Sequence, residues 1–315
     1  MARSASVSGP AGEPGSDPAS EPERPDHHPG THAAESVPDG DGEPLLRCAG
    51  LVIGYRRRAL LPPIDLTLRR GRLLLVAGHN GAGKSTWLKT LLGLVRPVAG
   101  RVEHAGPPPR MAYVPQHAGI DDLVTVRAGA VVAWGRLRGW SFLRPLAWRR
   151  DRAACRRALA QAGAEGLDSA RFHDLSGGQR QRILFARLLA GEADVAVLDE
   201  PTASMDVPGQ IAAYDRMAAL ARDHRMAVVV VTHTISTAVT HAHEMLLVDR
   251  PDRPDRPDRP GRPGRPDGRG SAGTVVHGSP REVLAHPAFV RTFGRIAAEP
   301  GPGAHVPPTP AEEAP

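Results

Sequence analysis

The most specific chemistry in the sequence lies in the stretch GHNGAGKST, which fits the pattern GxxxxGK[ST] between a predicted strand and a predicted helix. Glycines there let the backbone point successive N–H groups at a phosphate, and the helix start adds a partial positive charge. The Lys84 ammonium can reach the β- and γ-phosphates of a nucleotide, and the Ser85 hydroxyl can bind Mg²⁺. The sequence therefore predicts a nucleotide site made by Gly78, His79, Asn80, Gly81, Ala82, Gly83, Lys84, Ser85 and Thr86.

Two adjacent carboxylates follow a second apolar run, in DVAVLDEP. The apolar residues 195–198 are typical of a buried strand, which would deliver Asp199 and Glu200 at its carboxyl end, beside the glycine-rich stretch. Asp199 would hold Mg²⁺, directly or through water, and Glu200 would orient and polarise the attacking water. Together the two stretches predict an enzyme that hydrolyses a nucleoside triphosphate.

The base of that nucleotide is predicted to be adenine. Guanine-selective proteins of this type use an Asn-Lys-x-Asp loop, and Lys84 and Lys89, the two lysines of the chain, stand in no such loop. Tyr55, ahead of the glycine-rich stretch, can stack on adenine. A packing residue at the end of a strand is the alternative reading of Tyr55.

A second phosphate-binding turn is written in DLSGGQRQR at residues 174–182. A serine and two glycines at the start of a predicted helix form an anion site. The chain already has one such site at residues 78–85, so the second turn needs another explanation.

Short apolar runs alternate with helical patterns between the two ends of the chain. We expect buried parallel strands at 72–78, 111–115, 194–200 and 226–233, and helices at 84–94, 150–163, 178–190 and 208–223. Residues 117–173 interrupt the alternation with helical, Arg- and Trp-rich sequence, which predicts an inserted helical subdomain. The pattern indicates an α/β fold around a parallel sheet.

Three segments lack the apolar residues needed for a core. Residues 1–43 are an acidic extension rich in Pro and Gly and residues 298–315 a polar tail, and we expect both to be disordered. Residues 251–270 are a Pro/Asp/Arg insert between two strand-like stretches, and we expect them to form a surface hairpin loop. No apolar run approaches the roughly 20 residues that span a bilayer. Cys48 and Cys155 form no ligand pattern, so we expect free thiols in a reducing, cytoplasmic compartment.

The series GHNGAGKST, YVPQ, LSGGQRQR, VAVLDEP, ASMD and VVTH, in that order, resembles the ATP-binding cassette of ABC transporters. The resemblance covers residues 45–249 and continues more weakly to 297, which makes 44–297 the expected ATP-binding domain. It implies a P-loop NTPase with a RecA-like parallel core, an N-terminal antiparallel β subdomain and the helical insertion. It also implies ATP and Mg²⁺ as ligands.

The resemblance also implies why a second phosphate turn exists. In such cassettes two copies pair head to tail, so Ser176, Gly177, Gly178 and Gln179 would contact the ATP held by the second copy. Gln116 would contact Mg²⁺ or the attacking water, and His233 would bond the γ-phosphate. Asp206 would line the interface and couple the two sites.

A transporter subunit is the reading that the motif spacing favours over cassettes that act on nucleic acid or the ribosome. About ninety residues separate the two phosphate turns, and each occurs once in the chain. The permease would be a separate chain, with the ATPase on the cytoplasmic face of the membrane, and no nucleic-acid partner is expected. Docking would use the insert around Trp134, Trp140 and Trp148, although these rings could instead fill a core.

The stretches YVPQHAGIDDLVTV and DEPTASMDVPGQ resemble the manganese, zinc and iron branch of bacterial import cassettes. That branch works with an extracytoplasmic binding protein. Importers of chelated iron or cobalamin share part of the pattern and remain the alternative.

Overall fold

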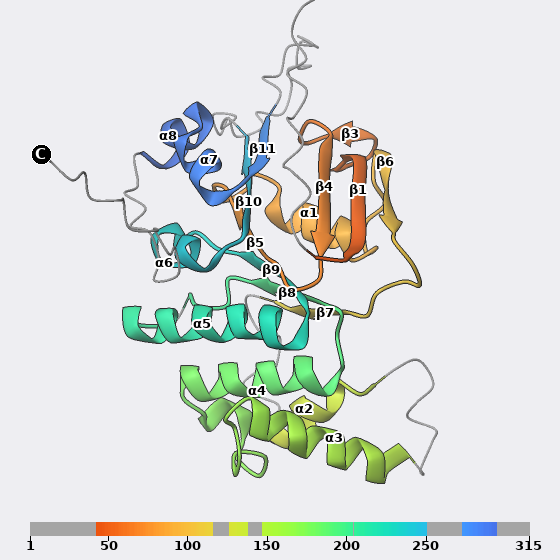
Figure 1. Ribbon diagram of the computed structural model, residues 1–315, viewed down its shortest axis with the longest axis vertical. Helices are drawn as coiled ribbons and strands as arrows, with labels where there is room; N and C mark the ends of the chain where they lie inside the picture. Colours follow the sequence, from red (N-terminus) through yellow and green to blue (C-terminus); the bar gives the residue numbers. More distant parts are fainter. Residues whose placement is uncertain (1–41, 116–125, 138–146, 204, 251–272, 295–315) are drawn as a thin grey trace, which may run out of the picture. The chain divides into compact units, whose positions relative to one another are not determined.

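The computed structural model describes residues 42–115, 126–137, 147–203, 205–250 and 273–294 (Figure 1). Residues 1–41 of the acidic extension, Gln116, the insert at 251–270 and the tail therefore lie outside the described residues. So do Trp140 and the side chain of Trp148.

A six-stranded sheet forms the centre of the fold, in the order β11-β10-β5-β9-β8-β7. All neighbouring strands are parallel except β10 and β11, which pair antiparallel on either side of the 251–270 insert. The strands are β5 (Leu73–Ala77), β7 (Met111–Val114), β8 (Val195–Asp199), β9 (Ala227–Val231), β10 (Glu244–Asp249) and β11 (Thr274–Gly278). The predicted α/β class and its parallel sheet are confirmed.

The alternation of side chains along the central strands creates two cores. In β5, Leu73 and Leu75 belong to one hydrophobic cluster, whereas Leu74 and Val76 belong to the other. All five residues of β5, β8 and β9 are buried, as expected for strands covered on both faces. The sheet thus holds the ends of its strands in a fixed frame.

The N-terminal part supplies one cover for this sheet. A three-stranded antiparallel sheet has the order β4-β1-β6, from β1 (Pro44–Val52), β4 (Ile64–Arg69) and β6 (Ala99–His104). The short strands β2 (Gly54–Tyr55) and β3 (Arg58–Ala59) pair as an antiparallel hairpin and come between β1 and β4 in the sequence. Buried Leu46, Cys48 and Leu66 share a cluster with Trp87 and Leu88 of α1 (Lys84–Leu91).

Most of the helices contribute to the other core. They are α2 (Ala128–Trp134), α3 (Ala147–Gln161), α4 (Gly177–Ala190), α5 (Val207–His224), α6 (Ile235–Ala238), α7 (Pro280–Ala285) and α8 (Pro287–Phe293), with single 3₁₀ turns at Phe172–Asp174 and Val239–His241. Helix α4 packs against α2 and α3, so these three form one helical group that continues beyond residue 173 (Figure 1).

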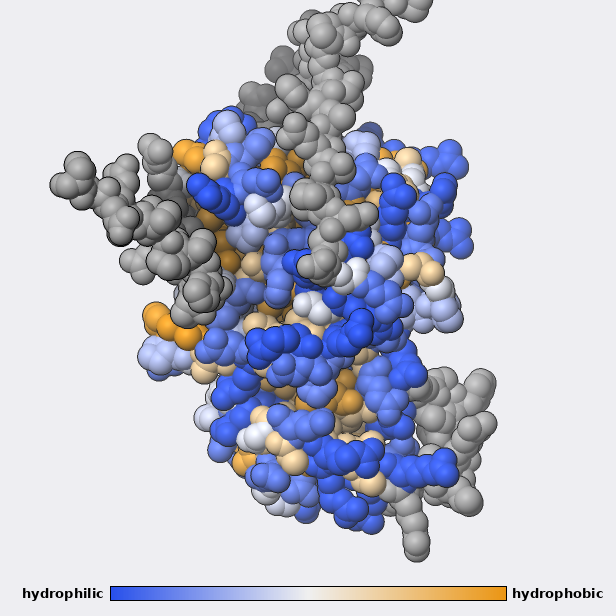
Figure 2. Space-filling model, in the orientation of Figure 1, coloured by the Kyte–Doolittle hydropathy of each residue, from blue (hydrophilic) through white to orange (hydrophobic). Residues whose placement is uncertain are grey.

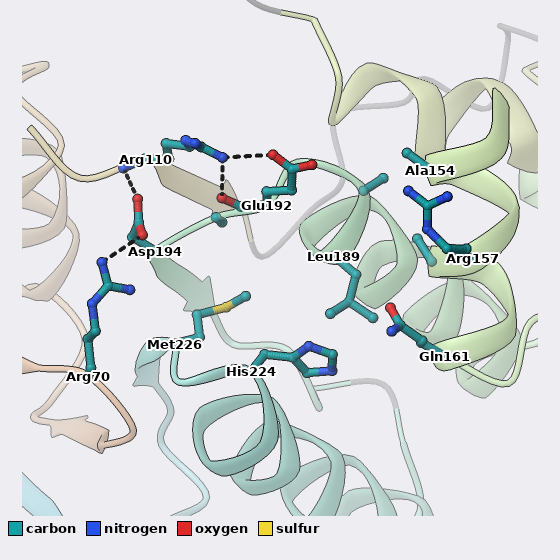
Figure 3. Close-up of a pocket in the computed structure, with 13 residues that line it drawn as sticks. Arg70, Arg110, Ala154, Arg157, Gln161, Leu189, Glu192, Asp194, His224 and Met226 are labelled. Atoms are coloured by element: carbon teal, nitrogen blue, oxygen red, sulfur yellow. Dashed lines mark hydrogen bonds and ion pairs between the residues drawn. The ribbon is translucent and has the colours of Figure 1, made fainter. Parts of the chain in front are cut away.

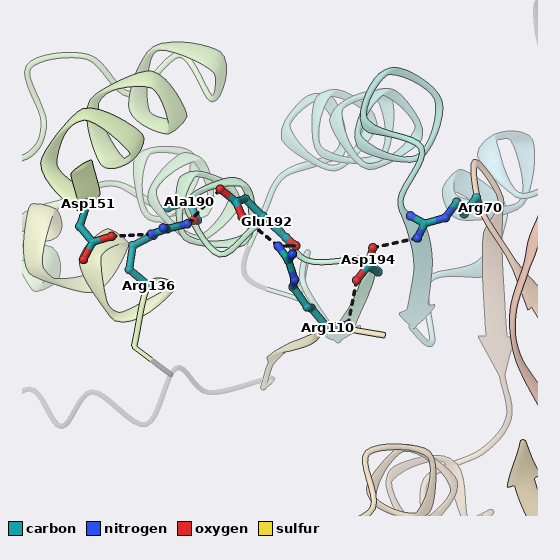
Figure 4. Close-up of polar contacts among 7 residues, drawn as sticks. All are labelled: Arg70, Arg110, Arg136, Asp151, Ala190, Glu192 and Asp194. Atoms are coloured by element: carbon teal, nitrogen blue, oxygen red, sulfur yellow. Dashed lines mark hydrogen bonds and ion pairs between the residues drawn. The ribbon is translucent and has the colours of Figure 1, made fainter. Parts of the chain in front are cut away.

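An ion-pair network begins in the helical group (Figure 4). Arg136, just after α2, pairs with Asp151 of α3 at 2.9 Å and with Glu192 at 3.1 Å. Its guanidinium also donates to the carbonyl of Ala190 at 3.0 Å. These contacts fix the C-terminal end of α4 against α2 and α3.

The same network continues into both sheets. Glu192 pairs with Arg110, ahead of β7, at 2.8 Å. The Arg110 backbone N–H donates to Asp194, ahead of β8, at 2.9 Å. Asp194 in turn pairs with Arg70, which follows β4, at 3.0 Å (Figure 4). One chain of charges therefore connects the helical group to both sheets.

A groove follows the boundary between α4 and α5 in three sections of about 500, 340 and 430 Å³. The 500 and 340 Å³ sections share the lining residues Arg182 and Arg216. The 340 and 430 Å³ sections share Gln161, Leu189 and His224. The 430 Å³ section ends at the ion-pair network (Figure 3). None of the residues predicted to hold a nucleotide in their own chain lines it.

The face drawn in Figure 2 is mostly hydrophilic where residues are described, with apolar side chains in small separate areas. Within the described ranges, no helix combines the length and the apolar character that crossing a bilayer requires. Both cysteines are free: Cys48 is buried in β1, and Cys155 is partly buried in α3.

Candidate functional site

The glycine-rich stretch forms the connection between β5 and α1, where the sequence predicted it. Gly81 and Gly83 have φ of +83° and +110°, which side chains with a Cβ rarely adopt. A Cβ on Gly78 would lie 2.1 Å from the Val248 carbonyl oxygen. The turn thus depends on glycine for its shape and for its contact with β10.

Lys84 folds back over this turn. Its Nζ donates to the carbonyls of Gly78 at 2.6 Å and His79 at 3.0 Å. Burial lowers the pKa of the Lys84 ammonium, while the charges of Glu200 and Asp199 act in the opposite direction. Among the described residues this ammonium has carbonyl acceptors alone and lies near two carboxylate charges, so it is suited to receive an anionic ligand.

Asp199 and Glu200 lie where β8 ends, and both are buried. The Tyr113 hydroxyl of β7 donates to the Asp199 carboxylate at 3.3 Å. Burial raises the pKa of Asp199, with the Tyr113 hydrogen bond and the Lys84 charge opposing it. The shift indicates that this carboxylate is held in a poorly solvated position that does not favour its charge.

Glu200 adopts φ of +51°, and its backbone N–H donates to the Val231 carbonyl at 2.8 Å. This left-handed conformation is uncommon for a residue with a side chain and occurs often at functional sites. It keeps the Glu200 side chain next to the end of β9.

His233, just after β9, approaches Glu200: its Nδ1 lies 2.7 Å from Glu200 Oε2. The two atoms are close enough for an ion pair but are not aligned as a hydrogen bond, so buried Oε2 has no hydrogen-bond partner among the described residues. The structure brings two predicted catalytic side chains together at a buried carboxylate oxygen that lacks an aligned hydrogen bond among the described residues.

Tyr55 is half-exposed and contacts the start of α1, where the Thr86 hydroxyl donates to the Tyr55 hydroxyl at 3.4 Å. The ring of His79 packs against that of Phe293 in α8, with the two ring centroids 5.2 Å apart. Both aromatic contacts border the glycine-rich turn. The stacking of Tyr55 on a base stays a prediction.

The second predicted phosphate-binding turn lies at the start of α4. Ser176 caps this helix, with its Oγ accepting from the Gln179 N–H at 3.3 Å, and Gln179 Oε1 accepts from the Ser176 N–H at 3.0 Å. No atom lies within 4 Å of a Cβ built on Gly177 or Gly178, so this end of the helix is open. Among the described residues, no hydrogen bond or ion pair connects it to the turn that holds Lys84.

Asp206 caps α5, with its Oδ1 accepting from the Gly209 N–H at 3.1 Å. This local role accounts for an aspartate here, and the predicted role at an interface stays a prediction. Gln116 lies outside the described residues.

Sequence reasoning missed two side chains. Tyr113 stands in the quoted stretch YVPQ, yet its contact with Asp199 depends on the register of β7 against β8. Gln181 is buried beside the second phosphate turn and has no hydrogen-bond partner among the described residues. Its place in LSGGQRQR was the only signal.

Comparisons with known proteins agree on one family. The family model described as ABC transporter matches residues 61–203. The zinc import ATP-binding protein ZnuC of Paramagnetospirillum magneticum is 32% identical over 255 residues, which cover 81% of this chain and 84% of that protein.

Two solved structures have the same fold. One is described as an inward-facing conformation of a metal-chelate type ABC transporter, with a TM-score of 0.65, 27% identity, and coverage of 80% of this chain and 89% of the other. The second is a bacterial ABC transporter cassette solved as a dimer, with a TM-score of 0.53, 22% identity, and coverage of 65% and 94%.

Proposed function

The chain belongs to the ATP-binding subunits of ABC transporters, which are ATPases, and on that premise we propose that it energises the import of a divalent metal ion through a separate permease. The observation that carries this proposal is the 32% identity to a zinc import ATP-binding protein over 81% of the chain. Zinc is therefore the first metal to test, followed by manganese and iron.

In the proposed reaction, Lys84 leaves its two carbonyl acceptors and binds the β- and γ-phosphates of ATP. The buried Glu200 carboxylate orients a water against the γ-phosphorus, and the bond to the leaving ADP breaks as water attacks. His233, 2.7 Å from Glu200, then serves as a hydrogen-bond donor near the γ-phosphate. Tyr55 stacks on the adenine.

The residues at the start of α1 and at the end of β8 fit Mg²⁺. Oxygen ligands suit this ion, and Ser85 offers an exposed hydroxyl while Asp199 offers a carboxylate. We assign Ser85, Asp199 and Gln116 as its ligands. When bound, Mg²⁺ would neutralise charge on the phosphates.

Two copies are proposed to pair head to tail on ATP. Support comes from the glycines at the start of α4, beside which the described residues leave open space, and from the dimeric cassette of the same fold. Ser176 Oγ accepts from its own helix, which leaves its hydroxyl hydrogen to donate to a phosphate. Asp206 would lie at the same interface.

The permease would dock on the helical group, at the cytoplasmic face of the membrane. Trp134 and Leu137 follow one another closely at the end of α2 and are 37% and 60% exposed. Exposed apolar side chains on this group suit a short permease helix. An extracytoplasmic binding protein would deliver the metal.

A metal chelate is the second candidate substrate. The transporter of known structure that matches 80% of this chain at 27% identity is described as metal-chelate type.

The ATPase step is tested by Glu200→Gln, which we expect to bind ATP and remain a dimer on size exclusion because hydrolysis stops. Lys84→Ala should lose at least tenfold in ATP affinity. Lys89→Ala, with an exposed lysine of the same helix, is the matched control. A Glu200→Gln protein that stays monomeric with ATP bound would contradict the head-to-tail pairing.

The substrate is tested by total cellular metal content. Cells whose only copy is Glu200→Gln are compared with cells that carry the wild type or Lys89→Ala. A fall in zinc, manganese or iron alone supports metal import and identifies the ion. A rise points to export, and unchanged metal content removes the free-ion substrate and directs the assay to chelates.

A further inference from the structure

Gln181 is a buried amide without a partner. The residue is 4% exposed, and neither its Nε2 nor its Oε1 has a hydrogen-bond partner among the described residues. Burying an amide without hydrogen bonds is unfavourable, so a group of this kind indicates a contact that forms in another state. Gln181 stands one turn after Gly177, on the same side of α4.

The space beside Gln181 is the 500 Å³ section of the groove. Gly177, Gly178 and Gln181 line it from α4, while Met205, Asp206 and Gly209 line it from the start of α5. The two walls carry the second phosphate turn and the proposed interface residue Asp206. Gln181 thus faces the gap between the two parts of the chain that a second copy would contact together.

On the facing wall, Asp206 offers a carboxylate oxygen as an acceptor among the described residues. The Met205 N–H already donates to the Thr202 carbonyl at 3.1 Å, and the Met205 carbonyl accepts from Gln210 at 3.2 Å. Asp206 uses Oδ1 to cap α5, which leaves its other carboxylate oxygen without a hydrogen bond among the described residues. A primary amide and a carboxylate oxygen form a strong charge-assisted hydrogen bond.

We propose that Gln181 is a positioning residue of the ATP-bound dimer, whose Nε2–H donates to the second carboxylate oxygen of Asp206 when the groove closes. The inference rests on the proposed head-to-tail pairing. ATP of the second copy fixes the start of α4, the interface fixes Asp206, and the new hydrogen bond holds the two in one geometry. The buried amide therefore favours the dimer and disfavours the free chain.

The test replaces the amide by an apolar chain of similar length, Gln181→Met, in the Glu200→Gln protein. Without nucleotide, we expect the melting temperature to rise or stay the same, because an unsatisfied amide is removed. With ATP, we expect the dimer to dissociate about tenfold more readily in sedimentation, since both copies lose a hydrogen bond. ATP affinity of the free chain, measured at concentrations too low for pairing, should not change.

Arg182→Met is the matched control. Arg182 lines the same groove section from the same helix, but its guanidinium donates to the Gly163 carbonyl. We expect its ATP-dependent dimer to match the parent.

A double-mutant cycle identifies the acceptor. Asp206→Ser keeps a helix-capping oxygen but is too short to reach Gln181. If the two side chains are partners, the double variant weakens the dimer no more than the stronger single variant, whereas independent effects would multiply.

The outcomes separate the two proposals. If Gln181→Met lowers the melting temperature without nucleotide, the amide already has hydrogen-bond partners in the free chain. This result would overturn the inference. If the parent protein, Glu200→Gln, and its Gln181→Met variant dimerise equally well with ATP, the inference is also overturned. The head-to-tail pairing then still stands. A parent that stays monomeric with ATP contradicts the pairing itself and the inference with it.

Discussion

Asp199, which we propose as a Mg²⁺ ligand, has a carboxylate that lowers the stability of the free chain. Burial raises the pKa of its carboxyl, although the Tyr113 hydroxyl and the Lys84 ammonium oppose the change. A raised carboxyl pKa means that the folded chain disfavours the charged form. The negative charge of Asp199 nevertheless suits the binding of a cation at this position.

We therefore expect Asp199→Asn to stabilise the free chain. In EDTA at pH 8, urea denaturation should give a free energy of unfolding about 1 kcal/mol higher than that of the wild type. The gain should disappear as the pH falls and the wild-type carboxylate becomes protonated, because the two chains then carry the same charge.

Asp223→Asn is the control for this measurement, because exposed Asp223 pairs with its neighbour Arg222 alone among the described residues. A loss of stability in Asp199→Asn at pH 8 would contradict the argument. ATP hydrolysis should be lost in the same variant.

At this scale the sequence could predict which residues form the turn and the strand end, because their spacing is local. Lys84, Asp199 and Glu200 lie at the predicted junctions of strands and helices. The sequence could not predict the contact of Tyr113 with Asp199 or the burial of Gln181. Their roles depend on which residues of distant elements face one another, through the register of β7 against β8 and the groove between α4 and α5.

Among the elements, the crossing of α2 and α4 depends on one small residue. Gly135 ends α2, and a Cβ built there would lie 2.2 Å from the carbonyl oxygen of Arg187 in α4. Its φ of −60° is ordinary, so close packing and not backbone conformation requires glycine. The two helices approach backbone to backbone.

Gly135→Ala should therefore cost about 1–3 kcal/mol of stability, because the added methyl group forces the helices apart. Urea denaturation monitored by circular dichroism measures this. Gly106→Ala is the matched control, since nothing lies within 4 Å of a Cβ on Gly106. Equal stability of the two variants would show that the crossing can adjust at little cost.

Element boundaries were predicted well where periodicity was strong. The helix expected at 208–223 is α5 (Val207–His224), and the strand expected at 72–78 is β5 (Leu73–Ala77). The helix expected at 84–94 ends at Leu91, because the chain turns at Gly93 with φ of +73°. The packing of α4 with α2 and α3 could not be predicted, because it depends on contacts between segments that are distant in the sequence.

For the whole molecule, Asp194 connects the parts that carry the site. It accepts from the Arg110 backbone and pairs with Arg70, so it holds the start of β8 against both sheets (Figure 4). Burial alone would raise the pKa of Asp194, but the Arg110 N–H and the Arg70 guanidinium outweigh it and lower the pKa. This carboxylate stabilises the fold when charged, in contrast to Asp199.

Asp194→Asn should lower the free energy of unfolding at pH 7 by about 1 kcal/mol, because a charge-assisted pair is lost. A lowered carboxyl pKa gives stability that is present above the ordinary pKa and is lost as pH falls through the folded value. The difference between variant and wild type should therefore narrow in strong acid. Urea titrations at pH 7 and pH 3 test this, and a difference that widens in acid would contradict it.

The two cysteines give the chain one selective point of chemical attachment. Burial raises the pKa of the Cys48 thiol in β1 to about 12, so almost none of it is thiolate at the pH of labelling reactions. Burial also raises the pKa of Cys155, but that thiol is partly accessible on α3. A maleimide dye will therefore react at Cys155 first, which places a fluorescent reporter on the helical group of the unmutated chain.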